Sequence, residues 1–305
     1  MDKIRRSVLF IPGDRPNMLQ NSGVFGSDSI ILDLEDAVNI REKDSARILI
    51  KHSLKSVDFN SCEKIVRINP FNTELGRKDL NEIFCEELDG IMVPKVDEEM
   101  LKKLHEVLNE KEVEISKKSK TILIPIIESA YALENIRTIG MTSSRIKAIL
   151  LGGEDYTADI EVQRTSEGEE LNFARNRTAL FCRANNIDAL DTPYVNTENI
   201  EGFIKDIKKG KKFGMTGKAA INPRQISDIN TIYSPSKEEI DNSKKIIQAY
   251  EKAKKENKGV FSLQGKMVDA PIVLRAEKVL NKAKKSNMIW GVIRWILKKK
   301  NQSNI

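Results

Sequence analysis

The sequence predicts an α/β protein built as a closed (β/α)8 (TIM) barrel with a C-terminal helical extension. Short apolar runs bounded by Gly or Pro recur along the chain, and segments with helical periodicity separate them. Such strand, helix, strand units require parallel strands, and eight of them over about 220 residues match one barrel. An open doubly wound sheet is the competing architecture, but the sequence has no GxGxxG or GxxxxGK(S/T) fingerprint.

The predicted strands are short and aliphatic, as buried parallel strands usually are. They lie at residues 7–12, 29–34, 64–68, 90–93, 122–127, 146–151, 187–190 and 218–221. The predicted helices lie between them, at residues 16–23, 42–54, 77–87, 98–108, 131–139, 170–185 and 197–209. A polar loop is expected at residues 157–168, before the sixth of these helices.

Three regions follow from this order of elements. They are a β/α barrel at residues 1–235, a helical extension at 236–285 and a basic amphipathic tail at 286–305. The extension is predicted to hold two helices, and Asp269 directly precedes the second. The tail contains Trp290 and Trp295, both tryptophans of the protein. An amphipathic helix of this kind could pack within an assembly, contact an anionic membrane surface, or stay disordered.

Composition excludes several classes of function. The net charge of +6 arises in residues 281–305, which hold seven Lys or Arg and no acid, so a basic nucleic-acid groove on the nearly neutral body is not expected. Three widely spaced cysteines and two histidines give no zinc or disulfide pattern. No apolar run reaches the roughly 20 residues that span a bilayer, and no export signal is evident, so a cytoplasmic protein is expected.

Acidic residues follow two neighbouring predicted strands at the point where each strand ends. Glu128 comes after the run at 122–127, and Glu154 and Asp155 come after the run at 146–151. Parallel strands end on the same side of a sheet, so these carboxylates are expected to lie close together and to share a hard divalent cation. Mg²⁺ suits Glu128 and Asp155 as ligands; Glu154 is the alternative to Asp155, and helix capping or surface charge is the alternative to a metal site.

Further polar residues stand at the ends of the second and third predicted strands. Glu35 is interpreted as a partner of waters on the metal, and Asp36 as a structural cap. Arg67 on an apolar strand needs an anion, either a substrate or a buried carboxylate such as Asp33 or Glu35. The position of Asp269 before a helix with Pro in its first turn is typical of an N-cap.

Eight segments follow one another in an order and spacing that resembles a known family. They are RRSVLFIPGDRPNML, IILDLEDAV, RINPFNTELGRKDL, IPIIESAYALENI, ILLGGEDY, DTPYVNTENIEGF, GKAAINPRQI and GKMVDAPIVLRAE. Together they resemble the acyl-CoA lyase family of β/α barrels, and within it the β subunit of citrate lyase (citryl-CoA lyase). The basic tail has no counterpart in this resemblance.

The resemblance implies a Mg²⁺-dependent carbon–carbon lyase, with Mn²⁺ as the alternative ion, that cleaves a citryl thioester to oxaloacetate and an acetyl thioester. The thioester is carried on coenzyme A or on a carrier protein. Glu128 and Asp155 match the family's metal ligands, with Glu128 also against the substrate. Arg67 matches the substrate-binding arginine, which can stabilise a thioester enolate. Asp269 matches an acid that transfers a proton in a neighbouring subunit's site.

These matches also imply partners. Asp269 acting at a neighbouring site implies a homo-oligomer, and a citrate lyase complex implies acyl carrier and transferase subunits. One alternative is a free-standing malyl-, methylmalyl- or citramalyl-CoA lyase or a related condensing enzyme. A second alternative, from another class, is a non-catalytic scaffold that binds a thioester or a membrane.

Overall fold

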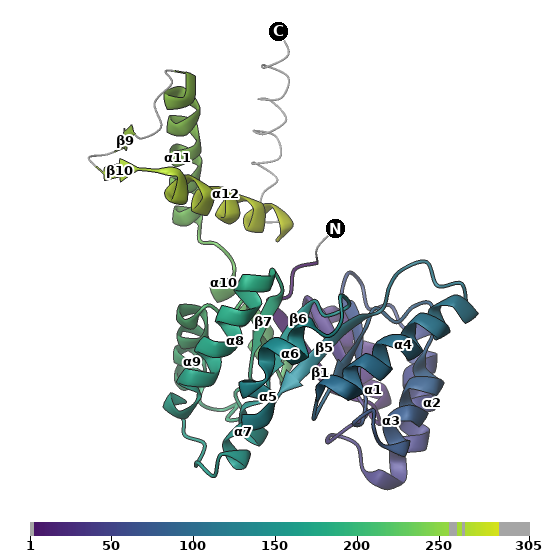
Figure 1. The fold of residues 1–305 in the computed structure, drawn as a ribbon. Helices are drawn as coiled ribbons and strands as arrows, with labels where there is room; N and C mark the ends of the chain where they lie inside the picture. The colour runs from purple at the N-terminus through teal and green to yellow at the C-terminus, as the bar shows by residue number, and fades with distance from the viewer. Residues whose placement is uncertain (1–2, 256–260, 264–265, 287–305) are drawn as a thin grey trace. The chain divides into compact units, whose positions relative to one another are not determined.

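Eight parallel strands close into a barrel in the structure, a computed structural model that describes residues 3–255, 261–263 and 266–286 (Figure 1). The strands pair in sequence order, and β8 pairs with β1 to close the ring. They are β1 (Ser7–Pro12), β2 (Ser29–Asp33), β3 (Glu63–Arg67), β4 (Gly90–Val93), β5 (Ile122–Ile127), β6 (Ala148–Leu151), β7 (Asp188–Asp191) and β8 (Gly217–Ala220). The predicted barrel is confirmed, with each strand close to its predicted bounds.

Helices surround the barrel, as its parallel strands require (Figure 1). They are α1 (Pro16–Asn21), α2 (Lys43–Ser56), α3 (Glu74–Ile83), α4 (Glu98–Glu114), α5 (Ala130–Glu134), α6 (Ile136–Met141), α7 (Gly153–Asp159), α8 (Asn172–Asn185), α9 (Ile200–Phe213) and α10 (Ile226–Tyr233). The single helix predicted at 131–139 is two helices that meet at Asn135. Helices α7 and α10 were not predicted.

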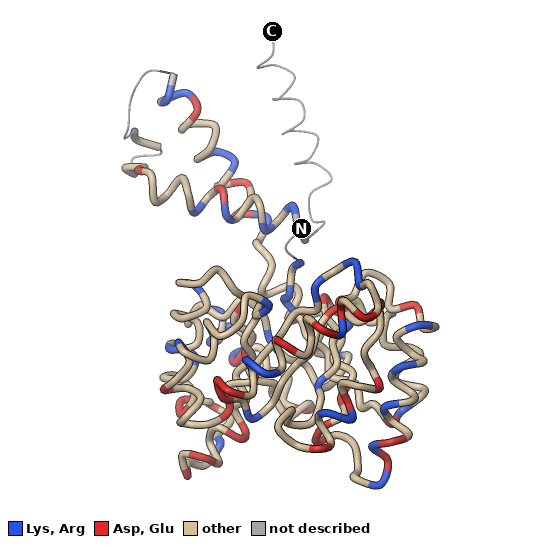
Figure 2. The backbone as a smooth tube through the Cα atoms, turned by 45° about the vertical axis from the view of Figure 1, so that its right-hand side comes forward, with Lys and Arg blue, Asp and Glu red and all other residues tan. Residues whose placement is uncertain are grey.

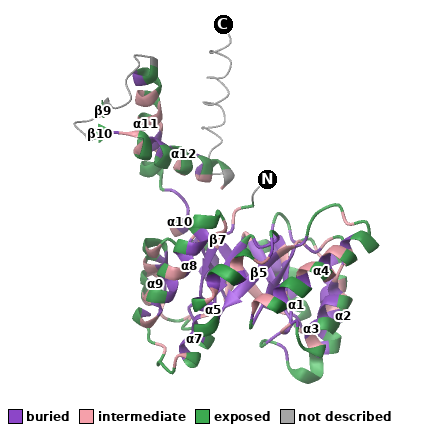
Figure 3. Ribbon diagram, in the orientation of Figure 1, coloured by how far each residue is buried: buried purple, intermediate pink, exposed green. Residues whose placement is uncertain are grey.

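The barrel interior is a packed apolar core to which every strand contributes. Its buried members are Val8, Ile31, Ile65, Met92, Ile124, Ile126, Ala148, Leu150, Leu190 and Ala219. Figure 3 shows the strands as the most continuously buried part of the barrel. Since side chains alternate across a strand, the outward residues of these strands meet the helices, and both faces are apolar. The interior is therefore filled, and only the ends of the barrel can form a site.

The end of α4 is tied to the strands beside it by a buried ion pair. Arg145 donates two hydrogen bonds to the carboxylate of Glu112, at 2.6 and 2.7 Å, and the N–H of Thr121 donates a third at 2.7 Å. Burial opposes ionisation of Glu112, but the hydrogen bonds from Arg145 and Thr121 outweigh it and lower the pKa to about 2. Glu112 thus stabilises the fold while it is ionised.

Acid should remove the stabilisation that Glu112 supplies. Because its folded pKa is depressed, that stabilisation is fully present above the unfolded value of 4.5 and is lost as pH falls toward about 2. We expect Glu112→Gln to be less stable than wild type by on the order of 2 kcal/mol at pH 7, and the gap to narrow between pH 5 and 3. Urea unfolding across this range tests it; a gap that stays constant with pH would contradict the assignment.

Residues after the barrel form a second compact unit. The barrel unit is Arg5–Asn230, and the second unit contains Thr231–Ile305 together with Met1–Ile4. Its described elements beyond α10 are α11 (Lys237–Lys255), α12 (Ala270–Lys285) and an antiparallel pair, β9 (Phe261–Leu263) with β10 (Lys266–Val268). Both helices were predicted, whereas the strand pair falls in a predicted loop. The two helices pack through Ile240, Ile247, Val279, Leu280 and Ala283.

Charge is mixed over the barrel unit. Figure 2 shows Lys and Arg interspersed with Asp and Glu along its helices and loops. In the described part of the chain, no helix is long and apolar enough to cross a bilayer. The tail predicted at 286–305 lies outside the described residues except for Ser286, and so do the partner and membrane contacts considered for it.

Candidate active site

A cavity of about 430 Å³ lies at the ends of the strands where the sequence places its polar residues. Its lining includes Asp33 at the end of β2, Arg67 at the end of β3, Glu128 directly after β5, and Asp155 after β6. Apolar side chains such as Phe10, Ile126 and Leu150 complete the wall. The structure therefore brings together four polar residues that are far apart in the sequence.

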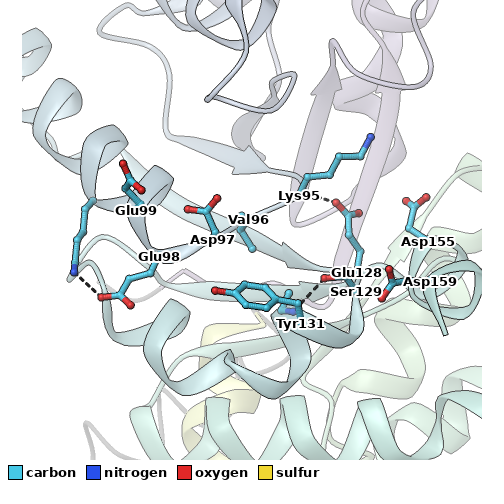
Figure 4. Close-up of a pocket in the computed structure, with 12 residues that line it drawn as sticks. Lys95, Val96, Asp97, Glu98, Glu99, Glu128, Ser129, Tyr131, Asp155 and Asp159 are labelled. Atoms are coloured by element: carbon cyan, nitrogen blue, oxygen red, sulfur yellow. Dashed lines mark hydrogen bonds and ion pairs between the residues drawn. The ribbon is translucent and has the colours of Figure 1, made fainter.

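Glu128 is fixed by the backbone of the preceding βα loop. Its side chain is only 6% exposed, and its Oε1 accepts a hydrogen bond of 2.5 Å from the N–H of Lys95 (Figure 4). Lys95 has φ 49°, in the left-handed region that costs a non-glycine residue of order 1–3 kcal/mol. The surrounding structure thus holds a strained backbone that aims an N–H group at Glu128.

Asp155 lies in the first turn of α7 and faces the same space as Glu128. Figure 4 shows the two carboxylates projecting in the same direction into a second, more open pocket of about 940 Å³, and both residues also line the cavity at the barrel mouth. Burial raises the pKa of Glu128 to about 7, and the negative charge of Asp155 contributes to this rise. The two carboxylates are therefore near neighbours, as their strand positions predict.

Arg67 is held from two sides by carboxylates of β2 and the residues after it. Its Nε and Nη2 donate to Asp33 at 2.7 and 2.6 Å, its Nη1 lies 3.0 Å from Glu35, and its guanidinium sits 5.0 Å from the centre of the Phe10 ring. Both ion pairs considered from the sequence are present. Asp33 also accepts the N–H groups of Glu35 and Ala37, so the orientation of Arg67 toward the cavity is fixed.

Glu35 completes a group of acids around Arg67. It is 4% exposed, and burial raises its pKa to about 8 against the opposing charge of Arg67. The negative charge of Glu128 also raises the pKa of Glu35, so the two side chains interact electrostatically. A cation bound at the mouth would favour the ionised forms of these buried acids.

The donor set fits Mg²⁺. The described residues contain no cluster of three or more His, Cys, Asp or Glu side chains arranged to hold a metal. Proteins usually hold Mg²⁺ through one or two carboxylates and leave its other positions to water and substrate oxygens, so Glu128 and Asp155 suffice. A structural zinc site needs four protein ligands of N or S type, which this mouth does not supply.

Gly152 lies where the start of α7 approaches the side chain of Glu128 closely. A Cβ at this position would lie 2.6 Å from the Cβ of Glu128 and 3.0 Å from its Oε2. We expect Gly152→Ala to displace Glu128 and to weaken Mn²⁺ binding roughly tenfold or more, measured by calorimetric titration. Gly140→Ala is the matched control, since its Cβ would meet the Phe181 ring at 2.3 Å. The control should lose stability and keep its metal affinity; equal losses of affinity in both would contradict the role of Gly152.

Four further polar residues stand at or shortly after strand ends, and two of them, Glu154 and Asp36, also line the cavity. Glu154 is a poor substitute for Asp155, because its side chain is 46% exposed and pairs with Arg164. Asp36 is exposed and lies 3.7 Å from Arg67 rather than capping a helix, so that interpretation is wrong. Asn222 caps a 3₁₀ turn (Pro223–Gln225), and Asp191 is buried in an ion-pair cluster described below.

Asp269 belongs to the second unit and is the N-cap residue of α12. Its side chain accepts a hydrogen bond from the N–H of Ile272 at 3.3 Å. This is the capping geometry that the sequence favours. The role of Asp269 in proton transfer stays a prediction.

Sequence reasoning missed the backbone contribution of Lys95, whereas the Gly152–Gly153 pair predicts a close backbone approach at this loop. A lysine in the left-handed region has no sequence signature, because most residues there are Gly, Asn or Asp. The Gly152–Gly153 pair was a usable signal: two glycines directly after a buried strand indicate close backbone approach. The structure adds that the group approached is the side chain of Glu128.

A closed parallel barrel with an acidic pair and a clamped arginine at its mouth defines an aldolase-type barrel of the metal-dependent class. The chain belongs to the HpcH/HpaI aldolase/citrate lyase family, whose profile matches residues 6–223. Its relatives include citrate lyase subunit beta of Leuconostoc mesenteroides subsp. cremoris, 39% identical over 94% of this chain and 96% of that protein. The resemblance inferred from the sequence motifs is confirmed.

Two more distant relatives extend this comparison. Mitochondrial citramalyl-CoA lyase of Homo sapiens is 28% identical over 92% of this chain and 85% of that protein. The second is Mycobacterium tuberculosis protein CitE, whose structure is in complex with magnesium, acetoacetate and coenzyme A. Its sequence is 23% identical to this chain, and the two structures superpose with a TM-score of 0.74. That match covers 93% of this chain and all of the other, so the fold is shared across both units of the chain.

Proposed function

We propose that the protein is the β subunit of citrate lyase, a Mg²⁺-dependent lyase that cleaves a citryl thioester to oxaloacetate and an acetyl thioester. The observation that carries the proposal is the pair of carboxylates, Glu128 and Asp155, beside the clamped Arg67 at the mouth of the barrel. The identity of 39% to a citrate lyase subunit beta, against 28% to a citramalyl-CoA lyase, supports the choice of substrate.

Glu128 and Asp155 would hold the metal ion, with Mn²⁺ as an alternative to Mg²⁺. When bound there, the ion supplies Lewis acidity toward the hydroxyl and carboxylate oxygens of the substrate. The Lys95 N–H fixes one oxygen of Glu128, which leaves the other oxygen for a ligand. Glu35, which is buried and paired with Arg67, is proposed as a partner of waters on the metal.

Arg67 provides positive charge where the cleavage creates negative charge. Breaking the carbon–carbon bond moves an electron pair onto the thioester, which becomes an enolate. The ion pairs with Asp33 and Glu35 raise the pKa of Arg67 against the opposing effect of burial, so its guanidinium is cationic at every working pH. Since Asp33 and Glu35 orient it before substrate binds, little reorganisation is needed during the reaction.

Asp269 is proposed to protonate the enolate carbon, in the site of a neighbouring copy of the chain. We expect Asp269→Asn to lower kcat by about 10²-fold or more, because Asn caps a helix as well as Asp but cannot donate this proton. Thermal unfolding should be unchanged. A normal kcat in this variant, measured by oxaloacetate release, would contradict the assignment.

Mixed assemblies distinguish action on a neighbouring copy from action within one chain. When Asp269→Asn and Glu128→Gln chains are combined, a site with both groups intact exists only if Asp269 comes from another copy. We expect partial recovery of activity in the mixture, in support of the proposed homo-oligomer. The absence of recovery in verified mixed oligomers would place Asp269 in its own chain's site.

The complex is proposed to include an acyl carrier subunit and a transferase subunit, and to be cytoplasmic. The name of the Leuconostoc relative, a subunit beta, supports a multi-subunit assembly. A comparison of the cleavage rates of the CoA-bound and the carrier-bound thioester would show which form the protein uses.

The test of this function is a comparison of thioesters. Purified protein with Mg²⁺ is offered citryl-CoA, malyl-CoA and citramalyl-CoA, and keto-acid release is followed with time. Faster cleavage of citryl-CoA supports the citrate lyase subunit. Preference for malyl- or citramalyl-CoA would favour the free-standing acyl-CoA lyase, to which the 28% identity with human citramalyl-CoA lyase points. Cleavage of no thioester would favour a non-catalytic scaffold.

A further inference from the structure

Helix α7, which bears Asp155, begins without a cap of its own. Its N-cap residue is Gly152, which has no side chain to accept the free N–H groups of the first turn. The N–H of Gly153 instead donates to Oγ1 of Thr192, at 3.0 Å, from the residue that follows β7. The first turn of the helix, and Asp155 within it, is therefore positioned by a different strand of the barrel.

Thr192 is itself held by a buried charge cluster, which we define as Arg175, Asp191, Asp206 and Lys218. Nζ of Lys218 donates to the backbone carbonyl of Thr192 at 2.6 Å and to Asp206 at 2.6 Å. Arg175 bridges the two carboxylates, with bonds of 2.9 Å to Asp191 and 2.6 Å to Asp206. Arg175, Asp191 and Lys218 are each 0% exposed, and Asp206 is 4% exposed.

Stability alone does not explain this cluster. Burying two cations and two anions costs desolvation energy that their attraction only offsets, and apolar side chains of similar volume often give equal or greater stability. The cluster holds the backbone carbonyl of Thr192 through Lys218, in the same residue whose side chain accepts the Gly153 N–H. Thr192 is 0% exposed, so it leaves no surface for a ligand although it borders the cavity.

The contact between Thr192 and α7 is close on both sides. A Cβ at Gly153 would lie 2.8 Å from Oγ1 of Thr192 and 3.1 Å from its Cβ, so only glycine allows this close contact. Thr157 closes the same turn, since its Oγ1 donates to the Gly153 carbonyl at 2.9 Å. The bond to Thr192 therefore ties an internally closed first turn of α7 to the residue after β7.

We propose that Thr192, held by the buried charge cluster, is a positioning residue for the metal site, because it caps α7 and thereby aims Asp155 at the ion shared with Glu128. The inference rests on the proposed metal function of these two carboxylates. It adds a buried residue that would act through Asp155, and it assigns a role to four buried charges. Such outer partners typically govern metal affinity by roughly ten- to hundredfold.

Thr192→Val tests the proposal, because it removes the acceptor and keeps the shape of the side chain. We expect the Mn²⁺ dissociation constant, measured by electron paramagnetic resonance on the full chain, to rise roughly ten- to hundredfold. Thr192→Ser, which keeps the hydroxyl, should bind Mn²⁺ as wild type does. A purely structural residue would lower the melting temperature in Thr192→Val and leave Mn²⁺ affinity within twofold of wild type, and that result would overturn the proposal.

Two further variants keep the outcome interpretable. If Thr192→Val does not fold, Thr192→Ala removes the hydroxyl without an added methyl group and is judged by the same Mn²⁺ affinity. Asp155→Asn reports on the metal site directly. Normal Mn²⁺ binding in Asp155→Asn would contradict the proposed function. If Asp155→Asn loses Mn²⁺ binding while Thr192→Val binds Mn²⁺ normally, only the positioning role of Thr192 is contradicted.

Discussion

Replacement of Glu128 by glutamine is expected to lower kcat/KM for citryl-CoA cleavage by about 10³-fold or more, because the metal contributes several kcal/mol to stabilising the transition state. Glutamine can still accept the Lys95 N–H, so the loss would reflect the missing charge rather than a collapsed loop. The loss should appear in the dependence of rate on Mg²⁺ concentration. Oxaloacetate release, coupled to a dehydrogenase and recorded across a Mg²⁺ series, measures it.

Glu154→Gln is the matched control for this variant. Glu154 adjoins Asp155 in the chain, but its side chain is half exposed and pairs with Arg164 at 3.2 Å. We expect the control to keep wild-type Mg²⁺ dependence. If Glu154→Gln lost activity while Glu128→Gln kept it, the pair of ligands assigned here would be wrong.

Arg67→Lys is the second substitution with a large expected effect. A lysine keeps one positive charge but cannot form the two parallel bonds to Asp33 together with the contact to Glu35. We expect kcat to fall by about 10²- to 10³-fold, as for loss of one preorganised electrostatic group, with a smaller change in KM. Steady-state kinetics on citryl-CoA separate the two constants.

The same change at Arg77 serves as control. Arg77 lies on exposed α3, where its guanidinium donates to the carbonyl of Asn72, and Arg77→Lys should behave as wild type. An Arg67→Lys enzyme that retained kcat and raised only KM would show that Arg67 binds the ground state and does not stabilise the enolate.

The barrel was predictable because its local signals agree with its topology. Runs such as 122–127 are apolar and short, the intervening segments have helical periodicity, and parallel strands must end on one side. That last rule alone brought Glu128 and Asp155 together from separate strands. The identity of the acids at the mouth could therefore be inferred before any coordinates.

The partners of those acids could not be inferred, since they depend on packing between strands. Nothing local in the sequence indicates that Thr192 caps α7, that Lys95 adopts φ 49°, or that Arg67 prefers two bonds to Asp33 over Glu35. Helix α7 itself escaped prediction because it is short and begins with two glycines, which are poor helix formers. Its first turn is held by the bond from the Gly153 N–H to Thr192, a residue distant in the sequence.

The shared metal site is tested most directly with a crystal of the full chain soaked in Mn²⁺ and recorded at the manganese absorption edge. We expect one anomalous peak at the barrel mouth, within coordinating distance of a carboxylate oxygen of both Glu128 and Asp155, with the remaining positions open to water or substrate. A manganese peak that touched only one of these residues, or that lay on other side chains, would contradict the shared metal on which the proposed cleavage depends.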